Sequence, residues 1–554
     1  MTAPNITVRQ AMGWCGLALG CALAGTAAQA QPAPTAPPST APANGAETER
    51  RVQVREFLLS GNTLIDAARL QAVLAPFQGP RTLAELRQAT QAVQAAYVDA
   101  GYGAVVAYLP SQAVEDGSIA INVLEGKVGT VVVEGAKRKT PAQIRAALPT
   151  LREGETPQVR RIDGELQMAN ENPGRTVGVL LGPGRQPGEV QATVKVQEAP
   201  AQRWQLSADN SGNQRTGRYR LSLGWQHADL SGHDDVLTLQ LQTSPTASDA
   251  VAVLSGGYRL PFPGWLSALD LFAAYNDVDG GTSATAAGDL SFSGRGRIAG
   301  ARWNLYLPRL AEYDQRLVFG LEQRAYLNQC SISGLPTGAC GPAGESVTVQ
   351  PFTLEWATQR GGQTSSGFNV AVSHNLGLGG RHGDAADFEA VRTGAKRRYT
   401  VLRAGAFLSL PVLEDWSLAA RLNGQFTGDA LVPGEQFGIG GSATVRGYEE
   451  REITGDSGLT ASLELVTPRF EGSFGSQKID LRLLAFADAG SVRNENAAAC
   501  TGNRSRCNLS AIGLGARLTL GPVQSRLSVA NALEDGATTL RGDWRTHFSL
   551  SASF

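Results

Sequence analysis

The sequence lacks most features that mark a helical membrane protein or a nucleic-acid-binding protein. Beyond residue 30 it contains no run of about 18 apolar residues, which a membrane-spanning helix needs. Charged residues make up only 18%, and 49 Lys+Arg balance 50 Asp+Glu, so no basic excess predicts binding to nucleic acid. The five histidines show no ligand spacing near the cysteines, so we expect no metal site.

Catalytic motifs are also scarce. The sequence has neither a nucleophile-elbow motif nor a phosphate-binding loop motif. The glycine-rich run Gly438–Ala443 has the spacing of a dinucleotide-binding turn, but it lacks the βαβ pattern that such a turn needs. We therefore expect a protein that is not an enzyme and carries no cofactor.

The N-terminus predicts export followed by a linker. Within residues 1–30, Arg9 supplies a positive end, Ala11–Gly25 is a short apolar stretch, and Ala28–Ala30 forms a small-residue cleavage site. This pattern is typical of a signal peptide. Residues 31–50 are rich in proline and alanine, which predicts an extended linker.

The cysteines beyond the signal peptide fall into two close pairs, Cys330 with Cys340 and Cys500 with Cys507. Each pair lies in a Gly/Asn/Ser-rich segment between two strand patterns. Because an exported chain reaches an oxidising compartment, we expect a small loop disulfide within each pair rather than four free thiols.

Over its C-terminal two-thirds, the sequence contains runs in which apolar and polar residues alternate with a period of two. The last run, His547–Phe554, has apolar side chains on one face and polar side chains on the other. Similar runs recur across residues 200–554, enough for about 16 strands. A soluble sandwich or a propeller would also alternate, but neither explains the aromatic C-terminus, the long polar loops and the export signal together. We predict a transmembrane antiparallel β-barrel with a wet lumen.

Residues 51–126 and 127–199 are predicted to be two copies of a small α+β unit with the order β-α-α-β-β. In the first copy we expect a strand over Val52–Leu59, a short helix capped by Thr63, and a longer helix whose capping box is Thr82 with Glu85. The second copy repeats this order. The fold class is therefore a barrel preceded by two α+β domains.

A family resemblance rests on the run Glu435–Tyr448, which ends in Val-Arg-Gly-Tyr and lies between two predicted strands. It resembles the signature loop of two-partner secretion transporters, the outer-membrane B components of the haemolysin and adhesin type. Phe486–Gly490 resembles the partner motif on a following strand. Leu109–Gln112 and Asn172–Gly174 resemble parts of the two polypeptide-transport-associated domains of that family.

The resemblance implies that a loop around 435–458 folds back into the lumen and carries the motif Val445, Arg446, Gly447 and Tyr448. It also implies that Arg446 meets an acidic group of the inner wall. Alternation along its own strand places Asp488 on the polar, inward face, so Asp488 is the expected partner. A bidentate pair would fix orientation as well as charge. The alternative is an ordinary surface loop with a hydrated Arg446.

The α+β domains predict a second site, because an exposed sheet edge can accept an extended peptide as an added strand. In this domain type, the strand that is the middle one of three along the chain lies at the edge of the sheet. By analogy, the middle strand of the second copy is the candidate. The alternative is a purely structural strand. The candidate docking edge comprises Thr176, Val177, Gly178, Val179, Leu180 and Leu181.

These expectations describe a translocation pore in the outer membrane of a Gram-negative bacterium, with its N-terminal domains in the periplasm. By resemblance, it recognises an unfolded exoprotein in the periplasm and secretes it to the cell surface without ATP. Its expected partners are that exoprotein, outer-membrane lipid and the barrel-assembly machinery during biogenesis. The alternative is an outer-membrane insertase, which typically carries more periplasmic domains. Many relatives have an N-terminal plug helix, but the prolines of residues 31–50 argue against one here.

Overall fold

The computed structural model describes residues 51–113, 116–213, 216–246, 251–285, 288–328 and 341–554. Over these residues the chain forms two compact units. One unit comprises residues 51–166 together with Val177–Val196. The other comprises Gln167–Thr176 together with Gln197–Phe554.

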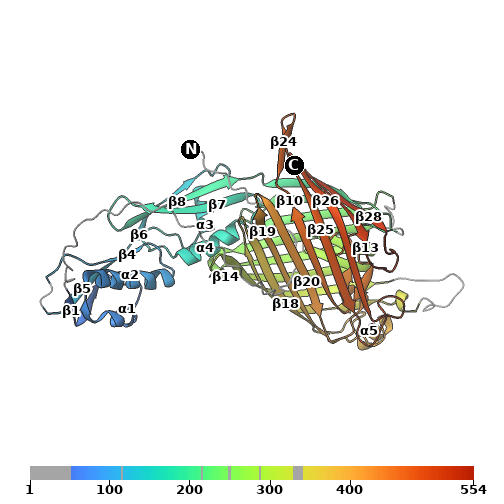
Figure 1. Ribbon diagram of the computed structural model, residues 1–554, viewed down its shortest axis with the longest axis horizontal. Coiled ribbons are helices and arrows are strands. Elements are labelled where there is room, and N and C mark those ends of the chain that lie inside the picture. The colour runs from blue at the N-terminus through green and yellow to red at the C-terminus, as the bar shows by residue number, and fades with distance from the viewer. Residues whose placement is uncertain (1–50, 114–115, 214–215, 247–250, 286–287, 329–340) are drawn as a thin grey trace, which may run out of the picture. The chain divides into compact units, whose positions relative to one another are not determined.

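The larger unit contains a closed antiparallel barrel (Figure 1). Its segments are β9 (Gln202–Asp209), β10 (Arg220–Ala228), β11 (Val236–Thr243), β12 (Ala252–Phe262), β13 (Ser267–Thr285), β14 (Gly288–Leu310), β15 (Tyr313–Leu327), β16 (Val347–Val349), β17 (Pro351–Arg360), β18 (Ser365–Asn375), β19 (Thr400–Leu413), β20 (Trp416–Phe426), β23 (Ser457–Val466), β24 (Phe470–Phe474), β25 (Gln477–Arg493), β26 (Arg506–Leu520), β27 (Val523–Ala532) and β28 (Trp544–Ser553). Because β16 and β17 both pair with β15, and β23 and β24 both pair with β25, these eighteen segments form sixteen strands. The predicted barrel of about 16 strands is confirmed.

The first and last strands close the ring. Leu550 of β28 lies opposite Ala208 of β9 in an antiparallel pair. The backbone of Phe554 continues this seam, since its N–H donates to the carbonyl oxygen of Trp204 at 3.0 Å and its carbonyl oxygen accepts from the N–H of Trp204 at 2.8 Å. The C-terminal run that predicted a barrel strand is therefore part of the closure.

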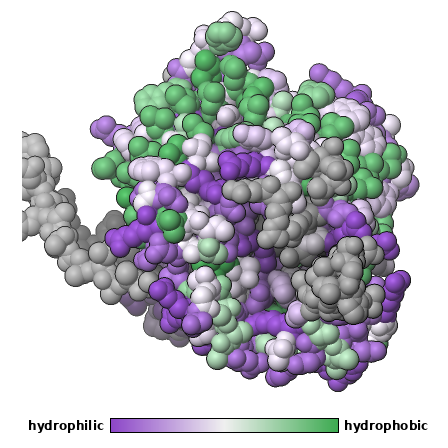
Figure 2. Space-filling view, turned by 90° about the vertical axis from the view of Figure 1, so that its right-hand side faces the viewer, coloured by the Kyte–Doolittle hydropathy of each residue, from purple (hydrophilic) through white to green (hydrophobic). Residues whose placement is uncertain are grey.

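Alternation sorts the side chains of the barrel between two environments. On β26, Leu514 is 68% exposed on the outer wall, whereas Asp488, on the inner face of β25, is 4% exposed. In Figure 2, hydrophobic residues gather along the outer wall and hydrophilic residues lie towards the hollowed centre of the face. A closed sheet also pairs its backbone groups internally, as hydrocarbon requires. The outer wall thus suits lipid, and the inner wall suits water.

The first α+β domain has a three-stranded sheet in the order β2 (Glu56–Ser60), β5 (Ser118–Glu125) and β4 (Val105–Tyr108). Its helices α1 (Ala67–Leu74) and α2 (Leu83–Asp99) share a buried core with the sheet. The capping box of α2 is confirmed, because the Thr82 hydroxyl accepts from the N–H of Glu85 and the Glu85 carboxylate accepts from the N–H of Thr82.

Two details of this domain differ from the sequence-based predictions. Thr63 does not cap α1: its hydroxyl donates to the Glu125 carboxylate, and Asp66, next to the first helical residue, is the cap. The strand predicted over Val52–Leu59 breaks at Arg55. Its first part, β1 (Val52–Val54), pairs with β3 (Gly79–Arg81) in a separate two-stranded sheet. The strand β3 comes directly after the short helix η1 (Ala75–Phe77).

The second α+β domain repeats the order with the sheet β6 (Lys127–Glu134), β8 (Glu189–Glu198) and β7 (Arg175–Pro183). Its helices are α3 (Pro141–Ala146) and α4 (Val159–Ala169), and α3 begins with a capping box formed by Thr140 and Gln143. The strand β7 lies at an edge of the sheet.

The remaining elements lie in the connections between the barrel strands. They are η2 (Pro263–Trp265), η3 (Gly341–Gly344), α5 (Ala385–Val391), η4 (Pro433–Glu435), β21 (Phe437–Ile439) and β22 (Ile453–Gly455). None of the helices in the described part of the chain is long and apolar enough to cross a bilayer.

Candidate functional site in the barrel lumen

The connection between β20 and β23, residues 427–456, folds against the inner wall, and we call it the lumen loop. Its two arms pair with each other as β21 and β22. Val445 and Tyr448 near its tip are fully buried in an apolar cluster with inward-facing residues of β25, β26 and β27. The segment that the sequence singled out therefore lies inside the barrel.

Arg446 is held by the carboxylate of Asp488 on β25. Its Nε lies 2.7 Å from Oδ2 and its Nη2 lies 2.8 Å from Oδ1, so the contact is bidentate. The backbone N–H of Arg446 also donates to Oδ2 at 3.1 Å. The side chains are only 9% and 0% exposed. Since a bidentate contact fixes both distance and orientation, it positions the loop tip on the wall.

Among the further wall residues that contact Arg446 are Glu464 and Phe486, neither of which the sequence reasoning assigned as its partner. Nη1 of Arg446 lies 2.8 Å from Oε1 of Glu464 on β23. The guanidinium carbon also lies 3.4 Å from the ring centroid of Phe486 on β25, in a cation–π arrangement. Both residues share the inward face with Asp488, so alternation could have placed them there, but sequence alone could not place them beside Arg446.

The two residues after Arg446 complete the docking. The N–H of Gly447 donates to Nε2 of His547 on β28 at 3.1 Å. The hydroxyl of Tyr448 lies 2.9 Å from the carbonyl oxygens of both Ser510 and Glu534. The motif therefore contacts β23, β25, β26, β28 and the connection between β27 and β28.

Small residues make room for this docking. Gly447 has φ +98°, and a Cβ there would lie 3.3 Å from the Cβ of Ala530. On the wall, a Cβ at Gly490 would lie 2.9 Å from Cγ2 of Val445. The positive φ therefore favours glycine at 447, and close approach favours it at 490, which explains why the run Phe486–Gly490 ends as it does.

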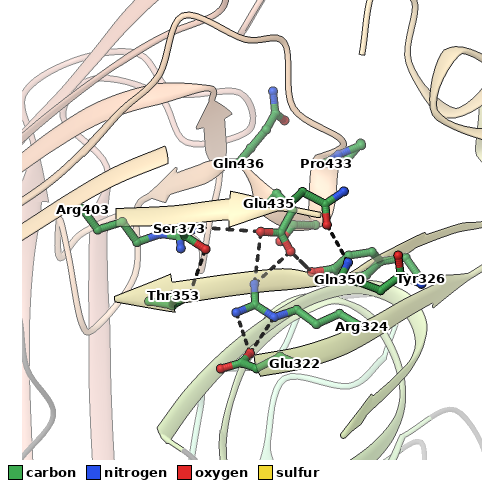
Figure 3. A network of polar contacts seen from close by, with 12 residues as sticks. Glu322, Arg324, Tyr326, Gln350, Thr353, Ser373, Arg403, Pro433, Glu435 and Gln436 are labelled. Atoms are coloured by element: carbon green, nitrogen blue, oxygen red, sulfur yellow. Dashed lines mark hydrogen bonds and ion pairs between the residues drawn. The ribbon is translucent and has the colours of Figure 1, made fainter. Parts of the chain in front are cut away.

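The base of the lumen loop has a second anchor, on a different part of the wall (Figure 3). The carboxylate of Glu435 accepts from Nη1 of Arg324 at 2.9 Å and from the hydroxyl of Tyr326 at 2.7 Å, both on β15. Arg403 of β19 lies 3.7 Å away. Arg324 in turn donates to Glu322 at 2.7 Å. No sequence signal assigned a partner to Glu435, because Arg324 and Tyr326 lie over 100 residues away in the chain.

Asp456, at the end of the lumen loop, ties it to two neighbouring connections. Its buried carboxylate accepts from Arg392 in the connection 376–399, and from the N–H of Glu495 at 2.8 Å in the connection 494–505. Beside Arg392, Phe388 and Val391 of α5 pack in an apolar cluster with inward-facing residues of β13 to β16. These connections therefore form one packed assembly inside the barrel.

The other predicted site residues lie elsewhere. Residues Thr176 to Leu181 belong to the edge strand β7, in which Val177 is buried and Leu180 is 55% exposed. Cys500 and Cys507 form a disulfide with Cα atoms 6.2 Å apart, and Cys507 lies in β26 rather than in the loop. Cys330 and Cys340 fall outside the described residues. Among the residues that the structure describes, no group of three metal-ligating side chains is close enough to hold an ion.

A barrel with transport-associated domains and an inward-folded Arg-Gly-Tyr loop defines a class of outer-membrane polypeptide-handling proteins. Within that class, the chain belongs to the haemolysin secretion/activation family ShlB/FhaC/HecB, whose sequence model matches residues 188–518. Residues 52–126 match the ShlB-type POTRA domain, the polypeptide-transport-associated domain predicted from the sequence. The family assigned by resemblance is confirmed.

Curated relatives include the heme/hemopexin transporter protein HuxB of Haemophilus influenzae, 23% identical over 389 residues. That match covers 68% of this chain and 65% of the relative's length. The outer membrane transporter CdiB of Dickeya dadantii is 24% identical over 411 residues, which cover 73% of this chain and 70% of that protein. Members of the family are thus transport proteins.

Solved structures agree on the fold. CdiB from Escherichia coli superposes with a TM-score of 0.75 at 20% identity and 93% coverage of both chains. CdiB from Acinetobacter baumannii gives a TM-score of 0.68 at 18% identity, with 92% of this chain and 91% of that chain covered.

Proposed function

We propose that this protein is the transporter of a two-partner secretion pair. It resides in the outer membrane with its α+β domains in the periplasm, where they bind an unfolded exoprotein. The exoprotein passes through the barrel lumen and leaves at the cell surface. No nucleotide is available in the periplasm, so folding of the exoprotein outside the cell supplies the driving force. Lipid surrounds the outer wall, and the barrel-assembly machinery inserts the chain during biogenesis.

The single observation that carries this proposal is the buried contact of Arg446 with Asp488 and Glu464 inside a barrel. A passive pore gains nothing from a loop fixed across its own lumen by buried charges. Removing one partner from a buried ion pair costs about 3–5 kcal/mol, because the other charge is left buried and unpaired. The contact therefore sets the position of a loop that has to rearrange when a polypeptide enters.

The experiment begins by comparing the proteins in the medium of strains with and without this chain, which identifies the exoprotein that depends on it. Replacement of the chain by Arg446→Ala should then lower the initial rate of secretion by about tenfold or more, because the buried carboxylate of Asp488 loses its cation. Heat-modifiable migration checks that the barrel still assembles.

Arg506→Ala is the matched control, because Arg506 is an exposed arginine at the start of β26. It should secrete at the wild-type rate. If no secreted protein depends on the chain, the proposed function is wrong. If Arg446→Ala assembles and secretes as the wild type does, the role of the loop contact is wrong.

A further inference from the structure

Three arginines stand side by side on the inner wall, and we call them the basic row: Arg482 of β25, Arg517 of β26 and Arg526 of β27. Arg517 lies directly opposite Arg482 in one strand pair and directly opposite Arg526 in the next. Their sequence neighbours Leu483 and Leu527 are 45% and 44% exposed on the outer wall. Because side chains alternate along a strand, all three arginines face the lumen.

The basic row is accessible. The side chains of Arg482 and Arg517 are 32% and 37% exposed, and Arg526 is also exposed. Asp488, three inward-facing positions further along β25 than Arg482, is 0% exposed in its side chain. The row therefore borders the open part of the lumen, whereas the anchor of the lumen loop does not.

An arrangement of this kind opposes folding, since like charges directly opposite each other on neighbouring strands are destabilising. Acidic groups do lie nearby: Asp480 is 3.9 Å from Arg482, and the Glu464 carboxylate contacts Arg517. Glu464 also contacts Arg446 of the lumen loop, so its one charge is shared between two guanidinium groups. The row thus keeps a positive potential towards the lumen.

We propose that the basic row is a binding surface for an acidic segment of a polypeptide in the lumen. This inference rests on the proposed function, and it adds the charge of the segment that the pore binds. Neighbouring strands lie about 4.8 Å apart, and alternate residues of an extended peptide lie about 7 Å apart, so carboxylates of one extended peptide can meet several guanidinium groups of the row. Each such contact can be bidentate.

The position of the row links binding to the lumen loop. A carboxylate that binds Arg517 competes with Glu464, which is also a partner of Arg446. Water in the lumen screens each contact, so the segment binds weakly enough to move on. The acidic segment would therefore lie next to the anchor that has to rearrange.

The test measures binding of two fluorescent peptides to the full chain in detergent micelles, by anisotropy at low and physiological ionic strength. One peptide alternates Glu with Ser and the other alternates Lys with Ser. The wild type should bind the Glu peptide in preference to the Lys peptide, and more weakly as salt rises. The variant R482Q/R517Q/R526Q should bind the Glu peptide about tenfold more weakly.

The matched control is R69Q/R87Q/R185Q, which removes the same charge from exposed arginines of the α+β domains. It should bind within about twofold of the wild type. Equal binding by the row variant and the wild type, or equal losses in both variants, would overturn the proposal. If the triple variant loses heat-modifiable migration, the single variant R526Q gives the same comparison. Because this assay measures peptide binding and not secretion, the basic row can fail to bind while the proposed function holds. Equally, the row can bind while no secreted protein depends on the chain.

Discussion

At the scale of single residues, Glu165 makes the second α+β domain sensitive to pH. Its carboxylate is fully buried and accepts from the N–H and the hydroxyl of Thr150 at 3.2 and 2.9 Å. Burial raises the pKa of Glu165 to about 7 from an ordinary value of 4.5. The folded domain therefore binds this proton more tightly than the unfolded chain does, and its stability declines as pH rises from about 4.5 to 7.

We expect the free energy of unfolding of this domain to fall by about 1–3 kcal/mol across that window. Pulse proteolysis in urea, on the full chain in micelles, measures it through cleavage within residues 127–166. Glu165→Gln should flatten the pH dependence. Glu155→Gln should not, because the Glu155 side chain is 59% exposed. A wild-type urea midpoint that is constant over this range would contradict the assignment.

The residues of the lumen site show what sequence can and cannot predict. Asp488 could be placed on the inner face by alternation alone, and the motif made Arg446 its expected partner. Glu464 could not be found in this way, because many polar residues share the inner face, and Glu435 could not, because its partners on β15 lie over 100 residues away in the chain. Alternation along a strand predicts whether a side chain faces the lumen or the lipid. Its contact partners depend on how the strands are arranged in the closed barrel.

At the scale of elements, β7 presents an open edge at the side away from β8. The N–H of Gly184 donates to the carbonyl oxygen of Glu189, and the N–H of Ala199 donates to that of Gly174, both at 2.8 Å. Because the bonding of an antiparallel strand alternates, the even-numbered residues between them face β8, and the N–H of Val179 faces the edge.

Val179→Pro should therefore weaken binding of the unfolded exoprotein, since it removes an N–H from the proposed docking edge. Val179→Thr keeps this N–H and the branched side chain and is the control. A titration of the full chain with labelled exoprotein measures the dissociation constant, which should rise by about fivefold or more for proline, the loss of about one hydrogen bond. Unchanged affinity in a proline variant that resists proteolysis as the wild type does would exclude this edge.

The elements themselves were predictable to different degrees. Barrel strands follow from alternation, because lipid outside and water inside impose it on every strand. The break at Arg55 and the strand β3 were not predicted, because β1 and β3 have three residues each and too short a pattern to read. The cap of α1 was misassigned because Thr63 and Asp66 are both good cap residues, and the Glu125 carboxylate engages Thr63.

At the scale of the whole molecule, the lumen loop spans the barrel. Its base contacts β15 and β19 through Glu435, and its tip contacts β23, β25 and β28 through Arg446 and Gly447. These strands extend over more than half of the ring. Buried charges on two different parts of the inner wall therefore hold the lumen loop between Glu435 and Arg446 across the lumen. The loop narrows the path through the barrel.

If the charges at the base and at the tip of the lumen loop both restrict the path, weakening those at the base should open the pore while the contacts of Arg446 remain. In Glu435→Gln, Arg324 and Arg403 lose their negative partner in the loop, while Arg446 keeps Asp488. We expect channel openings in planar bilayers to become about tenfold more frequent, because removing one charge of a buried pair costs several kcal/mol. Glu312→Gln is the control, since Glu312 pairs with Arg360 but is 71% exposed in its side chain, and exposed pairs contribute little. Wild-type opening frequency in Glu435→Gln would show that the tip alone holds the loop, and equal openings in both variants would assign the effect to loss of charge.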